Sequence, residues 1–105
     1  MISRISVIIG NVAQESQKEF RRSLSDEVLP LIRRIPGLDQ AYIHFVTEIE
    51  TGAPDVYGFI VMQYRSAKDK ETAMQSEERK QMQQRFRALG PLLDGGVYHI
   101  DSDVV

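Results

Sequence analysis

This sequence contains no cysteine, which excludes disulfide bonds, thiolate nucleophiles and zinc–sulfur sites. It also lacks an excess of basic residues: the formal net charge is −2, so nothing predicts a nucleic-acid partner or an anionic lipid surface. No apolar run approaches the length of a transmembrane helix, and Ile5–Ile9 is too short for a secretory signal. We therefore expect a soluble protein of the cytoplasm with no membrane partner.

The 105 residues suffice for one domain and are too few for two, so we predict a single domain over residues 1–105. Apolar residues that alternate with a period of two indicate β-strands. The predicted strands cover residues 2–9, 38–50, 56–65 and 97–101.

Two longer segments have apolar residues at helical spacing, over residues 14–35 and from Ser66 to about residue 89. Pro30 is expected to kink or restart the first helix, because proline lacks an N–H. Ser66 has the spacing of a helix N-cap, and a break is expected near Ser76. Gly95-Gly96 is interpreted as a helix stop.

Together these elements predict an α+β fold in β-α-β-β-α-β order, a ferredoxin-like arrangement with spatial strand order 4-1-3-2 and both helices on one face of an antiparallel sheet. For the hairpin of the second and third strands, we predict that residues whose numbers sum to 105 lie opposite each other, such as Phe45 and Ile60.

Alternation also divides the sheet residues between two faces. The face predicted to pack on the helices carries Ile5, Val7, Ile9, Ile43, Phe45, Ile60, Met62 and Ile100. The opposite face is predicted to carry Ile8, Tyr42, His44, Val46, Phe59, Val61, Val97 and His99. Because an apolar face of this size is usually an interaction surface, we expect it to form the interface of a homodimer, the alternative being a loop or tail that folds across it.

Two stretches resemble known proteins. Residues 29–38, with the pattern Pro-Leu-x-x-x-x-Pro-Gly-Leu, resemble the entry to the second strand in EthD-like proteins. Residues 74–93, with Ser-x-Glu followed by Leu-x-Pro-Leu, resemble the second helix of EthD-like proteins and of antibiotic-biosynthesis-type monooxygenases. Both groups belong to the dimeric α+β barrel superfamily. The resemblance implies two sheets packed face to face and a small hydrophobic ligand in the cleft between sheet and helices.

Where these groups commonly carry a histidine in the first helix, this chain has Val28. Met62 and Tyr64 stand where the groups have a Glu-x-Trp pair, and Met74 lies near the position of their second histidine. Only two histidines are present, His44 and His99. They are the acid–base groups that titrate near neutral pH, although each also fits a hydrogen-bonded interface residue. Two histidines without clustered carboxylates predict no metal site.

The candidate catalytic residues are therefore His44 and Tyr64, with no cofactor expected. Parity directs Tyr64 and Tyr98 toward the helices, and thioethers adapt to irregular apolar space. The candidate ligand-binding residues are Tyr42, Met62, Tyr64, Met82 and Tyr98. Methionines at this spacing also fit a plain hydrophobic core.

Two functions remain open. The first is an EthD-like protein that binds a small hydrophobic or aromatic molecule, as a cofactor-independent monooxygenase, isomerase or decarboxylase. The second is a non-catalytic dimeric binding or stress-associated protein that has lost the family's active site.

Overall fold

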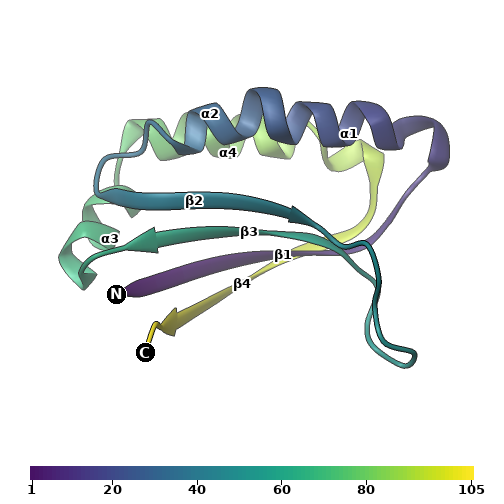
Figure 1. Cartoon of the computed structure of the whole chain (residues 1–105). Helices are drawn as coiled ribbons and strands as arrows, with labels where there is room; N and C mark the ends of the chain where they lie inside the picture. The colour runs from purple at the N-terminus through teal and green to yellow at the C-terminus, as the bar shows by residue number, and fades with distance from the viewer.

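The computed structural model describes residues 1–105 and contains one four-stranded antiparallel sheet with helices on one of its faces (Figure 1). The strands are β1 (Ile2–Val12), β2 (Leu38–Phe45), β3 (Val56–Tyr64) and β4 (Leu93–Asp103). Their spatial order is β2-β3-β1-β4. The predicted α+β, ferredoxin-like fold and its strand order are therefore confirmed.

The first helical region is continuous but changes its winding. It consists of a 3₁₀ turn (Gln14–Ser16), α1 (Gln17–Ser23), a π-helical turn (Leu24–Val28) and α2 (Leu29–Ile32). The backbone N–H of Leu29 donates to the carbonyl of Leu24, five residues earlier. The π turn ends at Val28, two residues before Pro30, which has no N–H to continue the α-helical pattern. The predicted effect of Pro30 is thus a widened turn rather than a new helix.

The second helical region breaks where predicted, between α3 (Ala67–Met74) and α4 (Glu77–Arg87). Ser66 and Ser76 cap the two helices, because each hydroxyl accepts a backbone N–H three residues later, at 3.1 and 3.2 Å. The prediction for Gly95-Gly96 is wrong. These glycines lie inside β4, which begins at Leu93, and they pair with β1.

The predicted register of the β2–β3 hairpin is wrong by two residues. Ile43 lies opposite Ile60 and Phe45 opposite Gly58, so the paired numbers sum to 103. The strand β2 ends at Phe45, five residues earlier than predicted, and residues 46–55 form a longer connection. A shift of two residues preserves the period of the side chains, so the predicted faces of β2 and β3 are correct.

The predicted faces of β1 and β4 are reversed. Ser6 lies opposite His99, and both side chains border the cavity under the helices. Ile8, predicted at a dimer interface, is fully buried there. Val7 lies opposite Tyr98 on the face without helices. The assignment failed because both faces are apolar, so hydrophobicity did not identify the side that the helices cover.

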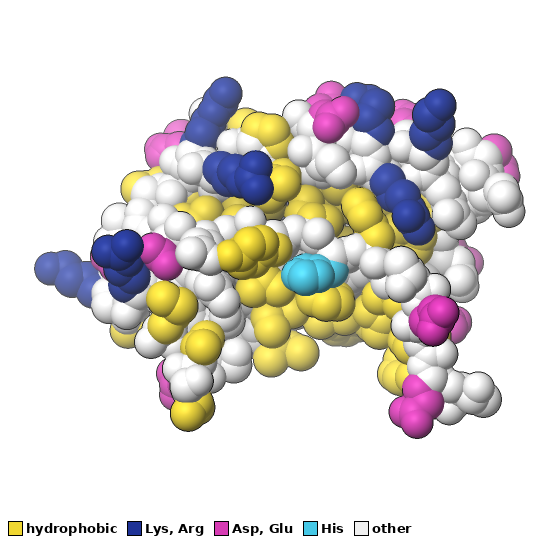
Figure 2. Space-filling model, viewed as in Figure 1, with side chains coloured by type: hydrophobic (Ala, Val, Ile, Leu, Met, Phe, Trp, Pro, Cys, Tyr) yellow, Lys and Arg dark blue, Asp and Glu magenta, His cyan; other side chains and the backbone are white.

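We call the face without helices the open face. It carries Ile5, Val7, Tyr42, His44, Phe59, Val61, Tyr98 and Ile100. Ile5, Val7, Ile9 and Ile100 are therefore not under the helices as predicted, and Val97 and His99 are not on the open face. Figure 2 shows hydrophobic side chains gathered on the strand side of the molecule, whereas Lys and Arg side chains lie mainly over the helices.

The core between sheet and helices is made mainly by apolar side chains of α1, the π turn, α2, β1 and β3. Its largest fully buried members are Tyr64, Phe20, Ile8, Leu24, Ile32 and Val28. Each aliphatic or aromatic side chain buried in this way is worth about 1.5–3 kcal/mol. No helix is both long enough and apolar enough to cross a membrane.

Candidate functional site

A cavity of 330 Å³ lies between the sheet and the helices and is open to solvent. Nine of its 18 lining residues are hydrophobic, among them Phe20, Ile60, Met82 and Phe86. The polar side chains in its wall are Arg4, Ser6, Arg79, Gln83, Arg87 and His99. An apolar cavity with a few converging polar groups is the usual form of a small-molecule site.

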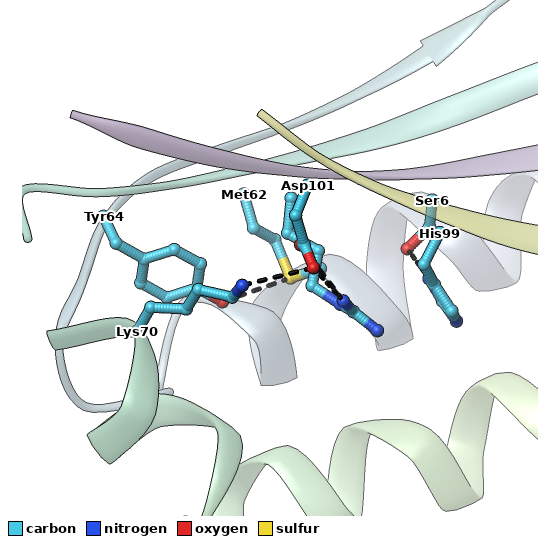
Figure 3. Close-up of polar contacts among 7 residues, drawn as sticks. Ser6, Met62, Tyr64, Lys70, His99 and Asp101 are labelled. Atoms are coloured by element: carbon cyan, nitrogen blue, oxygen red, sulfur yellow. Dashed lines mark hydrogen bonds and ion pairs between the residues drawn. The ribbon is translucent and has the colours of Figure 1, made fainter. Parts of the chain in front are cut away.

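A serine–histidine pair lies in the wall of this cavity. Because β1 and β4 run antiparallel, Ser6 and His99 stand opposite each other and project to the same side of the sheet. The Ser6 hydroxyl lies 2.9 Å from Nδ1 of His99 (Figure 3). The contact fixes the orientation of the imidazole, and Ser6 itself is only 4% exposed. This leaves Nε2 as the ring nitrogen available to a bound molecule.

The pKa of His99 is lowered from its ordinary value. Burial disfavours the charged imidazolium, and the positive charges of Arg4 and Arg79 add to this effect, while Asp101 opposes it weakly. The imidazole is therefore neutral at physiological pH. In the tautomer in which Nδ1–H donates to Ser6, Nε2 is able to accept a proton.

A charged network lies beside this pair, toward α3. Nη1 of Arg4 contacts both carboxylate oxygens of Asp101 at 3.1 Å, and Nζ of Lys70 lies 3.2 Å from Oδ2 of the same residue (Figure 3). Burial tends to raise the pKa of Asp101, but the hydrogen bonds from Lys70 and Arg4 outweigh it and lower the pKa. Asp101 is therefore an anion shared by two cations.

Arg79, in the first turn of α4, adds a further positive charge to the cavity wall. Its Nη1 donates to the backbone carbonyl of Met74 at 3.2 Å. None of the ion pairs in the chain includes Arg79. Burial and the nearby charge of Arg4 lower its pKa, yet a guanidinium keeps its proton in proteins. Arg79 is thus a half-buried cation without an anionic partner.

Tyr64 is buried in the core next to Arg4, Arg79 and Asp101. It is 1% exposed, and its hydroxyl has one partner, the sulfur of Met62 at 3.9 Å. Burial raises the pKa of Tyr64, so the phenol stays protonated. Tyr64 is not part of the cavity lining, although Met62 is. A bound molecule meets Met62 before it meets Tyr64.

The structure distributes the predicted ligand-binding residues over both sides of the sheet. Met62 and Met82 line the cavity. Tyr42 lies on the open face and is 44% exposed. The prediction that Tyr98 faces the helices is wrong, because it pairs with Val7 on the open face and is 64% exposed.

The two histidines also lie on opposite sides. His44 stacks on Phe59 on the open face, with ring centroids 4.5 Å apart, and is therefore remote from the cavity. His99, predicted at the dimer interface, faces the helices instead. The predicted interface residues Tyr42, Phe59 and Val61 do lie on the open face, and Val46 directly follows β2.

Sequence reasoning missed Arg4, Ser6 and Arg79. One signal was present: Arg4 and Ser6 are polar residues at alternate positions of a strand that is otherwise rich in β-branched residues. Polar side chains on a helix-covered face need partners, and here they border a solvent-connected cavity. No cluster of three His, Asp or Glu side chains is placed to bind a metal ion.

No family model and no curated protein matches the chain at a significant level. Solved structures do match it over nearly its whole length. An EthD-family protein from Bacillus halodurans has 20% sequence identity and a TM-score of 0.80, covering 100% of this chain and 99% of its own.

Two further structures have similar coverage. A dimeric ferredoxin-like protein of unknown function from a Jannaschia species has 10% identity and a TM-score of 0.67, with 99% of this chain and 100% of that chain covered. A monooxygenase from the gene ActVA-Orf6 of Streptomyces coelicolor, solved with Nanaomycin D, has 17% identity and a TM-score of 0.66, with 99% and 87% covered. At these identities the likenesses show the fold alone, an α+β ferredoxin-like fold that this chain has in common with these proteins.

Proposed function

We propose that this chain forms a cytoplasmic homodimer whose sheet–helix cavity binds a small apolar or aromatic molecule and transfers a proton to or from it at His99, without a cofactor. The observation that carries the proposal is the position of His99, oriented by Ser6 in a largely apolar cavity of 330 Å³. A volume of about 300 Å³ is at the small end for ligand sites, so the ligand has the size of one or two rings.

The chemistry follows from the protonation state of His99. A neutral Nε2 accepts a proton from a carbon next to a carbonyl, and the carbonyl becomes an enolate. Arg4 and Arg79 supply positive charge that stabilises the enolate oxygen. Isomerisation of a ketone starts with such an enolate, and decarboxylation of a β-keto acid produces one. An enolate on an oxygenated ring is also electron-rich enough to react with oxygen.

The open face supports the homodimer. Tyr42, Tyr98 and Ile100 are 44%, 64% and 52% exposed on a sheet face that no helix covers. A second copy of the chain is the simplest partner for such a face, because a two-fold interface joins the same apolar patch on both protomers. The similar structure from Jannaschia is described as dimeric.

Ligand binding is tested with 6-propionyl-2-(dimethylamino)naphthalene, a neutral two-ring probe whose fluorescence rises in apolar surroundings. The wild type should increase its emission. Val97→Phe fills the cavity and should abolish this increase, whereas the matched change Val104→Phe, in the exposed C-terminal residues, should not. A wild type that leaves the emission unchanged refutes the binding proposal.

Proton transfer is tested with 2-tetralone, a neutral aromatic ketone with acidic C–H bonds. The wild type should accelerate exchange of its α-protons with D2O, as followed by NMR, over the rate in buffer alone. His99→Gln should remove the acceleration and keep the binding of the neutral probe. Binding without accelerated exchange in the wild type contradicts the catalytic part of the proposal.

One observation favours the second function, a non-catalytic binding protein. At the positions where the resembled groups carry polar residues, this chain has Val28, fully buried in the core, and Met62, 6% exposed in the cavity wall. Under this function the ligand is held and not altered. The exchange experiment separates the two functions, since both predict binding of the neutral probe.

A further inference from the structure

The cavity has a charge opposite to that of the chain. Acidic residues outnumber basic ones in the sequence, 15 to 13. The cavity wall nevertheless contains three arginines, Arg4, Arg79 and Arg87, and no aspartate or glutamate. Positive charges in a low-dielectric wall attract an anion strongly, because water screens them less than on the surface.

The positive charge is not neutralised by neighbouring groups. Arg4 and Lys70 share the single carboxylate of Asp101. Arg79 donates to the carbonyl of Met74 and has no carboxylate partner. In the polar end of the site, three cations thus face one anion, while His99 is neutral. A guanidinium has five N–H donors, so most of those of Arg79 remain for a ligand.

The remainder of the wall is apolar. Phe20, Ile60, Met82 and Phe86 line it together with Ile32. These side chains bury rings or aliphatic groups and offer no hydrogen bonds. The two parts of the cavity together fit an amphiphilic molecule, one that has an anionic group at one end and an apolar body at the other.

We propose that the ligand of this cavity is an aromatic or alicyclic carboxylate, with its carboxylate bound by Arg79 and its ring system among the apolar side chains that include Phe20 and Phe86. Planar carboxylates accept two parallel hydrogen bonds from one guanidinium, which makes arginine the suitable partner. This inference rests on the proposed function, since it names the chemical class of the molecule that the same cavity binds.

The test compares 2-naphthoate with 2-naphthalenemethanol, which have the same ring system and differ in charge. Isothermal titration calorimetry of the wild type should show about 10- to 100-fold tighter binding of the carboxylate, the range expected for hydrogen bonds between charged groups. The preference should shrink in high salt, since part of it is electrostatic.

Arg79→Gln should remove the preference for 2-naphthoate and leave binding of the alcohol unchanged. Arg34→Gln removes the same charge from an exposed position outside the cavity wall and should keep the preference. Arg79→Lys, which retains the charge without the planar fork, should keep part of it.

Two outcomes separate the two proposals. Equal affinities for the alcohol and the carboxylate in the wild type overturn the carboxylate inference and leave the binding function standing. No binding of either compound overturns the binding function itself. A preference that persists in Arg79→Gln overturns the assignment to Arg79.

Discussion

Replacing Ile100 by aspartate is predicted to dissociate the homodimer. Ile100 lies on the open face and is 52% exposed in one protomer, so about half of the side chain remains for a partner to cover. Full burial of an isoleucine is worth about 1.5–3 kcal/mol, which leaves about 1 kcal/mol per protomer for the interface. Because a two-fold axis places two copies in the interface, the loss of apolar contact amounts to about 2 kcal/mol.

The introduced carboxylates add to this loss. An unpaired charge buried in an interface costs at least about 2 kcal/mol. With one carboxylate from each protomer the charge cost is about 4 kcal/mol, and the total of about 6 kcal/mol corresponds to a roughly 20,000-fold rise in the dissociation constant of the dimer. Sedimentation velocity over a range of micromolar concentrations measures this change, and circular dichroism verifies that the protomer remains folded.

Ile49→Asp is the matched control. Ile49 is 50% exposed, but it lies in the connection between β2 and β3 rather than on the sheet face. It should leave the dissociation constant nearly unchanged. A wild type that sediments as a monomer at micromolar concentration refutes the reasoning, as does an equal weakening in both variants.

Three further predictions concern titration and stability. The NMR titration midpoint of His99 should lie below its ordinary value of 6.5, and Arg79→Gln should raise it, because a nearby positive charge that disfavours the imidazolium is removed. An unchanged midpoint in the variant would show that the two groups do not interact. Gly10→Ala should lower the free energy of unfolding by more than about 2 kcal/mol in urea, since φ is 120° and the new Cβ would lie 2.2 Å from a backbone oxygen of β4. Gly52→Ala, with φ 91° and no atom within 4 Å, should cost only about 1 kcal/mol, so equal losses would contradict this reasoning. Met82→Ala should lower the free energy of unfolding by about 2 kcal/mol, the low end for such a truncation, because Met82 borders an open cavity. A calorimetric scan that shows no loss of stability would place Met82 outside the core.

The fold could be predicted from the sequence because its periodicities are strong and its breaks are chemically distinct. Ser66 and Ser76 cap helices at the expected positions, and the four strands alternate clearly. The bounds of the strands follow less directly from the sequence. The glycines at 95 and 96 fit a helix stop by their local preference, although pairing with β1 holds them in a strand. Tertiary pairing overrides local preference at such positions.

The site could be predicted only in part, for a physical reason. Hydrophobicity identifies the buried face of a sheet when the other face is polar. Here Ile5 and Val7 make the open face as apolar as the covered one, so the polar Arg4 and Ser6 were not recognised as cavity residues. Met62 and Met82 line the cavity as predicted, because a thioether fits irregular apolar space. The pairing of Ser6 with His99 depends on the register of two strands far apart in the sequence.

The glycine at position 95 limits how ligand preference in this cavity can change during evolution. A Cβ on Gly95 would lie 1.9 Å from the carbonyl oxygen of Ile9, so this part of the cavity wall admits no side chain. The facing wall is formed by side chains of α4, including Gln83 and Phe86, where the backbone already carries a side chain and accepts a different one. Adaptation to a different ligand is therefore expected to proceed through substitutions in α4, against a backbone surface of β4 that stays the same.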